Sequence, residues 1–204
     1  MKQPHTKQHR GMTTGEVLVI VAVSSVLILA IMNAVAFFYQ SNAYTVSQAY
    51  QVSHARRGIE HMVRDLREMT FADDGTFPLA VMDAHSVGFY SDIDRDDSVE
   101  YISYDLDTTT LYKYIYNATG SPLTYNLTTP DETHIISEYV QNESDGVHTF
   151  MYYDETGLEV SAGGVVTDIR YIETRLIINV DPVRFPDDFM LRSSAALRNL
   201  KENF

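Results

Sequence analysis

A run of acidic residues near the middle of the chain carries side chains suited to metal binding. The run contains five carboxylates: Asp92, Asp94, Asp96, Asp97 and Glu100. Oxygen ligands at alternating positions can converge on the hard cation Ca²⁺. The full EF-hand pattern is absent, because Asp97 replaces the turn glycine and Ser103 stands at the twelfth position. Two interpretations remain open: a Ca²⁺ site, which is the one candidate cofactor, and a solvated acidic hairpin loop.

Glu16 is a carboxylate in an unusual place, at the mouth of a long apolar segment. No other charged residue occurs from there through Phe38. A carboxylate at membrane depth is costly unless it has a partner. Its side chain can find that partner on another subunit, or within the first turn of its own helix.

The chain offers no recognisable catalytic set, and we therefore expect it not to be an enzyme. His85, His134 and His148 lie among serines and aspartates, without a nucleophile elbow or an HExxH-type spacing. His54 and His61 are seven residues apart, so we expect a solvated pair on one helix face. Cysteine is absent, which excludes disulfides and thiol chemistry.

The apolar segment Val17–Phe38 has the length of a membrane span. As an α-helix it is about 33 Å long, which is enough to cross the hydrocarbon core of a bilayer. The preceding residues carry Lys2, Lys7 and Arg10 and no acidic residue. By the positive-inside rule, the N-terminus is expected in the cytoplasm and the bulk of the chain outside.

The same helix is predicted to continue beyond the apolar segment. Residues 40–69 contain no proline and one glycine, Gly58. An apolar face follows the helical repeat, formed by Ile59, Met62, Val63, Leu66 and Met69. The opposite face is charged, with Arg56, Arg57, Glu60, Arg64, Asp65 and Glu68. We therefore expect one helix from near Glu16 to near Met69, about 80 Å long.

The remainder of the chain is typical of strands and turns. Six segments rich in aromatic and β-branched residues are predicted strands: 86–91, 99–106, 110–116, 147–153, 168–180 and 189–197. Residues 135–140 fit a short helix or a strand equally well. Strands after one long helix predict an α+β fold, with an antiparallel sheet packed on the helix.

Composition limits the partners of the exported part. The 204 residues include 15 basic and 28 acidic ones, a formal net charge of −13. Such acidity disfavours direct binding of nucleic acid or anionic lipid headgroups. The sequence predicts four parts: a basic leader (1–11), a transmembrane and assembly half of the helix (12–38), its amphipathic half (39–70) and a β-rich extracytoplasmic domain (71–204).

The N-terminal pattern resembles the class III signal of type IV prepilins and type II secretion pseudopilins. A basic leader ends in Gly11, Met12 becomes the first mature residue, and Glu16 the fifth. The resemblance implies a pilin-like fold, cleavage between Gly11 and Met12 by a prepilin peptidase, and N-methylation of Met12. It also implies that Glu16 meets the terminal amine of a neighbouring subunit. Met12 departs from the more usual Phe, and Gly15 stands where a larger apolar residue is common.

The order of the later segments is similar to that of J-type minor pseudopilins and related minor pilins. The segments are HARRGIEHMVRDLREM, GFYSDIDRDDSVEYISYDL, LYKYIY, HTFMYYDETG and FMLRSSAALRNL. This likeness implies a subunit at the tip of a type IV pilus or pseudopilus that primes filament assembly. Its expected partners are other minor subunits on parallel helices, the inner-membrane assembly platform and the membrane itself. The alternative is a membrane-anchored binding module, an adhesin or substrate receptor, tethered by the helix.

Overall fold

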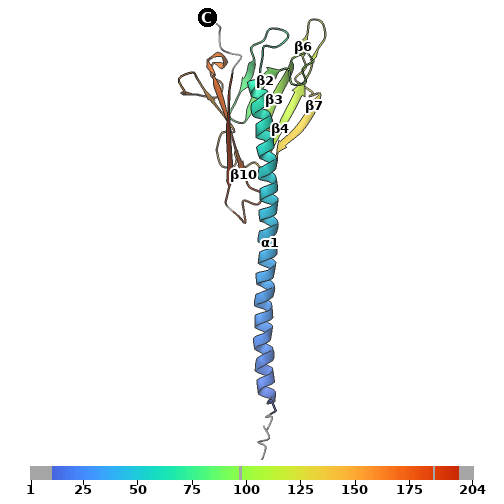
Figure 1. The fold of residues 1–204 in the computed structure, drawn as a ribbon, viewed down its shortest axis with the longest axis vertical. Coiled ribbons are helices and arrows are strands. Elements are labelled where there is room, and N and C mark those ends of the chain that lie inside the picture. Colours follow the sequence, from blue (N-terminus) through green and yellow to red (C-terminus); the bar gives the residue numbers. More distant parts are fainter. Residues whose placement is uncertain (1–10, 97, 186, 198–204) are drawn as a thin grey trace, which may run out of the picture. The chain divides into compact units, whose positions relative to one another are not determined.

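One helix dominates the N-terminal part of the computed structural model, which describes residues 11–96, 98–185 and 187–197. Helix α1 runs from Thr14 to Arg67, over 54 residues, and confirms the predicted long helix (Figure 1). The spatial contacts between residues divide the protein into two compact units, Met1–Thr45 and Val46–Phe204. Each unit is described by itself.

The first unit contains the apolar half of α1. Every side chain from Gly11 to Gln40 is exposed, although the segment is uncharged after Glu16. The most apolar window of α1 has a mean hydropathy of 2.7, and none of it is buried within the chain. By length and composition α1 could therefore span a membrane.

The second unit begins with a five-stranded antiparallel sheet in the order β1-β2-β3-β4-β7. Its strands are β1 Leu79–Met82, β2 Ser86–Ser91, β3 Glu100–Asp107, β4 Thr110–Tyr116 and β7 Glu132–Ser137. The undecided segment 135–140 thus supplies the end of a strand. A small ribbon pairs β5 Ala118–Thr119 with β6 Thr124–Tyr125.

A four-stranded sheet, in the order β11-β10-β8-β9, completes the unit. It comprises β8 Phe150–Tyr153, β9 Glu159–Val160, β10 Tyr171–Ile178 and β11 Phe189–Ala196, and a short 3₁₀ helix, η1 Val166–Asp168, precedes β10. All three C-terminal strands that the sequence predicted are present, each shorter than expected, β11 by a single residue. Together with α1, the sheets confirm the α+β class.

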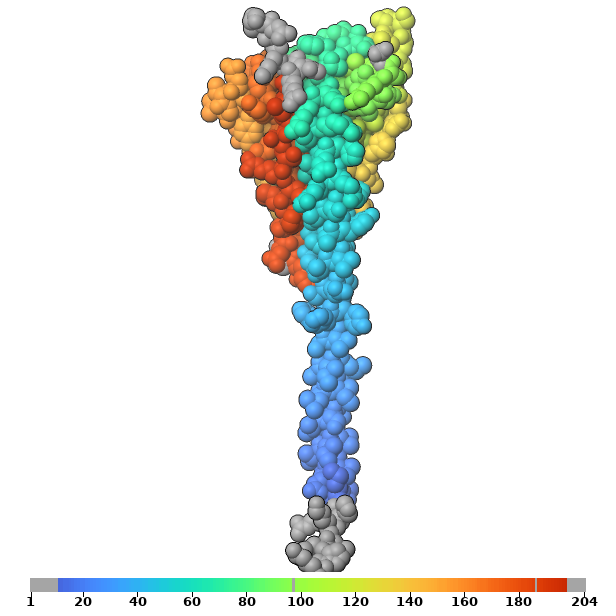
Figure 2. Space-filling view, in the orientation of Figure 1, coloured from blue at the N-terminus to red at the C-terminus, as the bar shows by residue number. Residues whose placement is uncertain are grey.

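The second half of α1 forms one core with both sheets. In Figures 1 and 2 the green-to-yellow strands of the first sheet and the orange-to-red strands of the second lie on either side of this half of the helix. The predicted apolar face is buried as expected, from Ile59 to Met69. Phe89 and Tyr104 of the first sheet and Ile172 of the second belong to the same cluster. Burial of this face, rather than helix propensity, fixes the helix in place.

One residue of the predicted charged face lies in the core. Asp65 is only 3% exposed, whereas its neighbours Arg64 and Glu60 are exposed. The sequence placed Asp65 opposite the apolar face, and the structure buries it nonetheless. The reason is a cross-chain partner: Lys113 of β4 reaches Asp65 from a sheet position that local helical periodicity cannot reveal.

Candidate functional site

Helix α1 begins with a capping box formed by Thr13 and Glu16. The Glu16 Oε2 atom accepts hydrogen bonds from the Thr13 backbone N–H (2.8 Å) and hydroxyl (3.1 Å). In return the Glu16 backbone N–H donates to Thr13 Oγ1 (3.3 Å). These reciprocal bonds satisfy donors that the first helical turn otherwise leaves without partners.

The capping box bears on both interpretations of Glu16. Its carboxylate finds partners within its own first turn, which is the local alternative that the sequence left open. The same bonds hold the side chain at the start of the helix. Gly11 and Met12 precede the helix and are exposed, so the predicted cleavage position lies in non-helical chain. Gly15 is the position that departs from the usual pattern. A Cβ added there would have no neighbouring atom within 4 Å.

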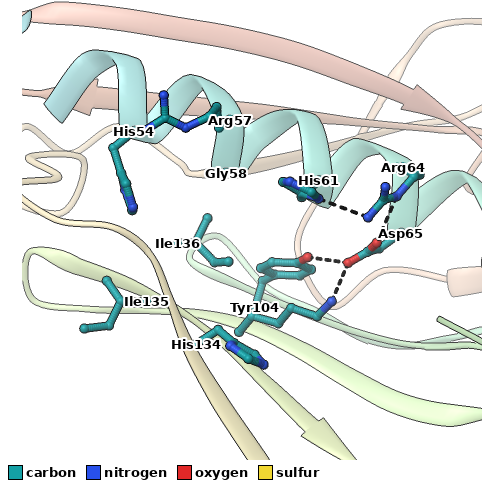
Figure 3. Close-up of a pocket in the computed structure, with 11 residues that line it drawn as sticks. His54, Arg57, Gly58, His61, Arg64, Asp65, Tyr104, His134, Ile135 and Ile136 are labelled. Atoms are coloured by element: carbon teal, nitrogen blue, oxygen red, sulfur yellow. Dashed lines mark hydrogen bonds and ion pairs between the residues drawn. The ribbon is translucent and has the colours of Figure 1, made fainter. Parts of the chain in front are cut away.

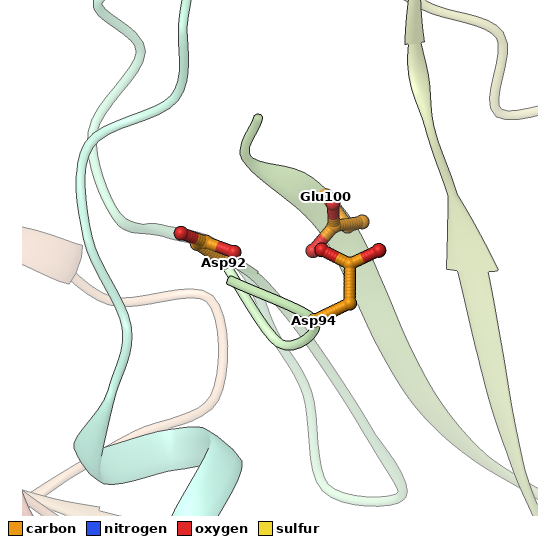
Figure 4. Close-up of side chains that lie close together, drawn as sticks. All are labelled: Asp92, Asp94 and Glu100. Atoms are coloured by element: carbon orange, nitrogen blue, oxygen red, sulfur yellow. The ribbon is translucent and has the colours of Figure 1, made fainter. Parts of the chain in front are cut away.

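Three of the five predicted calcium ligands come together. One carboxylate oxygen from each of Asp92, Asp94 and Glu100 lies within 4.8 Å of the others (Figure 4). Asp96 is not part of this group; its carboxylate accepts a hydrogen bond from the Ser98 backbone at 2.9 Å. Asp97 lies outside the described residues. Three oxygens at this spacing can contribute to a Ca²⁺ site, but a complete site needs six to eight.

Glu100 is the buried member of this acidic group, with 4% of its surface exposed. Burial raises the pKa of its carboxyl, and the nearby Asp94 and Asp92 add to the increase, against a hydrogen bond from Ile93 N. Ser91, opposite Glu100 in the β2–β3 register, has a buried hydroxyl without a hydrogen-bond partner among the described residues. The simple picture of a solvated loop therefore does not hold for Glu100.

A cavity of about 370 Å³ lies between α1 and the β4–β7 side of the first sheet (Figure 3). We call it the basic pocket. Its lining includes three cations and three histidines: Arg57, Arg64, Lys113, His54, His61 and His134. Asp65 is the one carboxylate of the lining. The pocket is an accumulation of cationic and imidazole groups in a chain of net negative charge.

The floor of the basic pocket is a buried polar network. Asp65 Oδ2 accepts hydrogen bonds from Lys113 Nζ (2.6 Å) and the Tyr104 hydroxyl (2.7 Å). Burial, together with the Asp65 charge, raises the pKa of Tyr104 well above its usual value. Tyr104 therefore remains a neutral donor, and the carboxylate holds helix and sheet together.

Close packing of α1 on β7 forms the end of this pocket. A Cβ on Gly58 would lie 2.6 Å from the Ile136 carbonyl oxygen and 2.6 Å from its Cγ2. Only glycine permits this approach of the helix to the strand. The helix residues on either side of Gly58 therefore stand next to β7.

The sequence analysis did not identify this pocket. Its signal was present in the spacing of His54, Arg57, His61 and Arg64, which recur at intervals of three and four along one helix face. The opposing residues, Lys113 and His134, could not be added, because they meet the helix only through the sheet register.

Of the three histidines considered for catalysis, His85 and His148 lie together and His134 lies elsewhere. His134 lines the basic pocket. His85 Nδ1 lies 3.1 Å from the hydroxyl of Thr149, which is fully buried, and its ring packs edge-on against His148. This arrangement joins two imidazoles and a hydroxyl, without a carboxylate hydrogen-bonded to either ring among the described residues.

No protein-family model and no curated protein matches the chain. The fold and the sites define an α+β protein with one helix suited to crossing a membrane, a capped N-terminal turn and a basic pocket on its second unit.

Proposed function

We propose that the chain is a minor pilin or pseudopilin of the J type. In this role it has a pilin-like fold and joins the tip of a type IV pilus or type II secretion pseudopilus through its N-terminal helix. It primes filament assembly there and has no enzymatic activity. Before assembly it crosses the cytoplasmic membrane once, with the N-terminus inside and the second unit outside.

The observation that carries this proposal is the place of Glu16. The residue sits in the first turn of a helix whose following residues are uncharged, mostly apolar and exposed through Gln40. A plain membrane tether gains only the local helix cap from a carboxylate there, and the charge is costly at membrane depth unless it is partnered. A subunit in a filament gains assembly specificity when the carboxylate meets the amine of a neighbour's first residue.

The exposed Gly11–Met12 segment supports the same proposal. Cleavage between these residues produces a new amine on Met12, adjacent to the Thr13–Glu16 capping box. The amine is then N-methylated, as the prepilin resemblance implies. The parallel apolar helices of sibling subunits cover the exposed face of the first unit, including a hollow formed by Val35, Phe38 and Tyr39.

Mass spectrometry of the membrane-extracted protein tests the processing step. The expected N-terminal peptide begins at Met12 and carries one additional methyl group. An intact N-terminus, in cells with an active prepilin peptidase, contradicts the proposal and favours a tether.

Co-assembly tests the role of Glu16 itself. Glu16→Ala is expected to insert and be cleaved normally but to be lost from purified filaments or tip complexes. Glu60→Ala removes an exposed glutamate elsewhere on the same helix and serves as the control. Normal incorporation of Glu16→Ala would show that the carboxylate has no assembly role.

The alternative function is a membrane-anchored binding module, and the basic pocket favours it. Under this alternative the helix is only a tether, and Glu16→Leu is tolerated. The two functions differ in one measurement, because only the subunit depends on both cleavage and Glu16.

A further inference from the structure

The basic pocket and the exposed part of β7 next to it form a continuous surface. We propose that this surface binds an extended acidic segment of a partner protein, with carboxylates on alternate residues. The inference uses only residues of the second unit and does not depend on filament assembly.

Among the described residues that line the basic pocket, positive charges outnumber negative ones. The single carboxylate of this lining, Asp65, is paired with Lys113 at 2.6 Å, and both side chains are largely buried, with 4% and 13% exposed. This pair accounts for one negative and one positive charge. Arg57 and Arg64 therefore remain as a net positive charge in the lining of the cavity.

The two guanidinium groups retain capacity for a ligand. Arg57 Nη1 donates to the neutral hydroxyl of Ser53 at 3.1 Å. Among the described residues, no carboxylate lies within ion-pair distance of Arg57. Arg64 is 61% exposed, and its Nε is 3.9 Å from Asp65 Oδ1, at the limit of an ion pair. Planar guanidinium groups bind carboxylates through paired hydrogen bonds.

His61 adds a donor to this set, whereas His134 Nε2 already lies 3.0 Å from Glu132 Oε2 on β7. His61 Nδ1 lies 3.0 Å from Arg64 Nη2; since a guanidinium only donates, Nδ1 is the acceptor. The neutral imidazole then carries its proton on Nε2, which is a donor for a ligand. The three histidines do not belong to any metal-type group found among the described residues, which favours this role over metal binding.

Strand β7 provides the backbone part of the surface. It is the outermost strand of the five-stranded sheet. Residues 132–135 are exposed, whereas Ile136 and Ser137 are buried beneath α1. An exposed edge strand presents unpaired backbone donors and acceptors that an extended peptide can use.

Together these features specify the occupant. In a strand added to β7, every second side chain points toward the same face, so carboxylates on alternate residues can all be directed toward the side of the strand on which the pocket lies. The cavity, at about 370 Å³, is larger than a single small anion requires and lies within the range of ligand sites. Charge complementarity thus favours an acidic peptide over a neutral or basic one.

Binding of a labelled peptide to the full chain in a non-ionic detergent tests the inference. The probe is a fluorescent peptide of alternating aspartate and threonine, measured by anisotropy at low salt. We expect saturable binding that Arg57→Gln weakens about tenfold, as expected for loss of a charge-assisted hydrogen bond. Arg64→Gln is expected to act in the same direction.

The matched control is Arg56→Gln, which removes the same charge one residue away on an exposed position outside the pocket. We expect it to leave the affinity within about twofold. Equal weakening by both variants would overturn the inference, because it would mean nonspecific attraction. All three substitutions replace exposed side chains, and unchanged far-UV circular dichroism checks that the proteins are folded.

Three competitor arms distinguish the source of the carboxylates. A peptide of the same composition with its aspartates consecutive, and an asparagine version, are both expected to compete poorly. Inorganic phosphate is expected to compete only weakly. Competition by phosphate as strong as by the alternating peptide would overturn the peptide assignment and identify a small-anion site instead.

Discussion

Asp65 of α1 and Lys113 of β4 form a buried ion pair across 48 residues of sequence, with 2.6 Å between Oδ2 and Nζ. Because the Tyr104 hydroxyl bonds the same oxygen at 2.7 Å, the carboxylate has two donors. The pair joins the helix to the sheet at one position, and its removal is the most direct test of how the second unit is held together.

Asp65→Asn is expected to destabilise the second unit strongly. It leaves the Lys113 ammonium buried without a counter-charge, which typically costs about 3–5 kcal/mol in the free energy of unfolding. The double variant Asp65→Leu/Lys113→Met removes both charges and is expected to be closer to the wild type. Urea unfolding followed by circular dichroism measures both, and a double variant less stable than Asp65→Asn would contradict this account.

Gly58→Ala is expected to lower stability, although alanine is the better helix former by about 1 kcal/mol. The new Cβ would stand 2.6 Å from a backbone oxygen of Ile136, which cannot move like a flexible side chain. Overpacking of this kind costs about 1–3 kcal/mol. Thermal unfolding measures the net effect, with Arg56→Ala on the exposed side of the helix as a control that should change little.

Glu100→Gln is expected to stabilise the protein at neutral pH in the presence of a chelator. Burial, then Asp94 and Asp92, raises the pKa of Glu100. The folded state therefore favours the protonated form of Glu100 more than the unfolded chain does. Its stabilising effect is complete below the ordinary carboxyl pKa and is lost as the pH rises through the higher pKa of the folded state. Glutamine keeps an acceptor for Ile93 N without the charge.

Melting temperatures measured from about pH 3 to about pH 8, a range that spans the ordinary carboxyl pKa, test this effect. The wild type and Glu100→Gln should converge at the acidic end and separate above it. Glu138→Gln removes an exposed carboxylate and is the control. Added millimolar Ca²⁺ distinguishes the two interpretations of the acidic group: a rise in melting temperature of the wild type alone would indicate a cation site.

Glu173 is expected to contribute to acid sensitivity with the opposite sign. Its burial raises the pKa of the carboxyl, but hydrogen bonds from Arg192 and Arg175 outweigh burial and lower it overall. The stabilisation is therefore complete above the ordinary carboxyl pKa and is lost as the pH falls through the lower pKa of the folded state.

Glu173→Gln should accordingly reduce stability at neutral pH more than at the acidic end. The loss follows from two guanidinium groups, on β10 and β11, that keep only a neutral partner. Acid titration of the circular dichroism signal tests it. A variant whose difference from the wild type does not depend on pH would show that the two ion pairs make no net contribution.

Local patterns were sufficient to predict much of the fold. The helical repeat through Ile59 and Leu66 and the alternation in residues 110–116 each arise from burial of one face, which is a property of neighbouring residues. Strand β1 was missed because its Ala80 and Val81 are exposed apolar residues, which hide the alternation. The two-residue strands β5, β6 and β9 are too short to carry a periodic signal.

The candidate sites also differ in whether they depend on local or long-range contacts. The Thr13–Glu16 contact lies within one helical turn, so residue spacing alone brings the two together. The basic pocket depends on Lys113 and His134, which reach α1 through the pairing of β4 with β7. Register between strands is a long-range property, and a single sequence does not encode it in local spacing.

The capping box also fixes the residue at which α1 begins. Thr13 sets where the helical hydrogen bonds begin, and that boundary lies one residue beyond Met12. A peptidase that cuts after Gly11 would thus meet a peptide bond already outside the helix and need not unwind it. The same two side chains would fix, by residue count, how far the new amine stands from the apolar surface that we propose enters the filament.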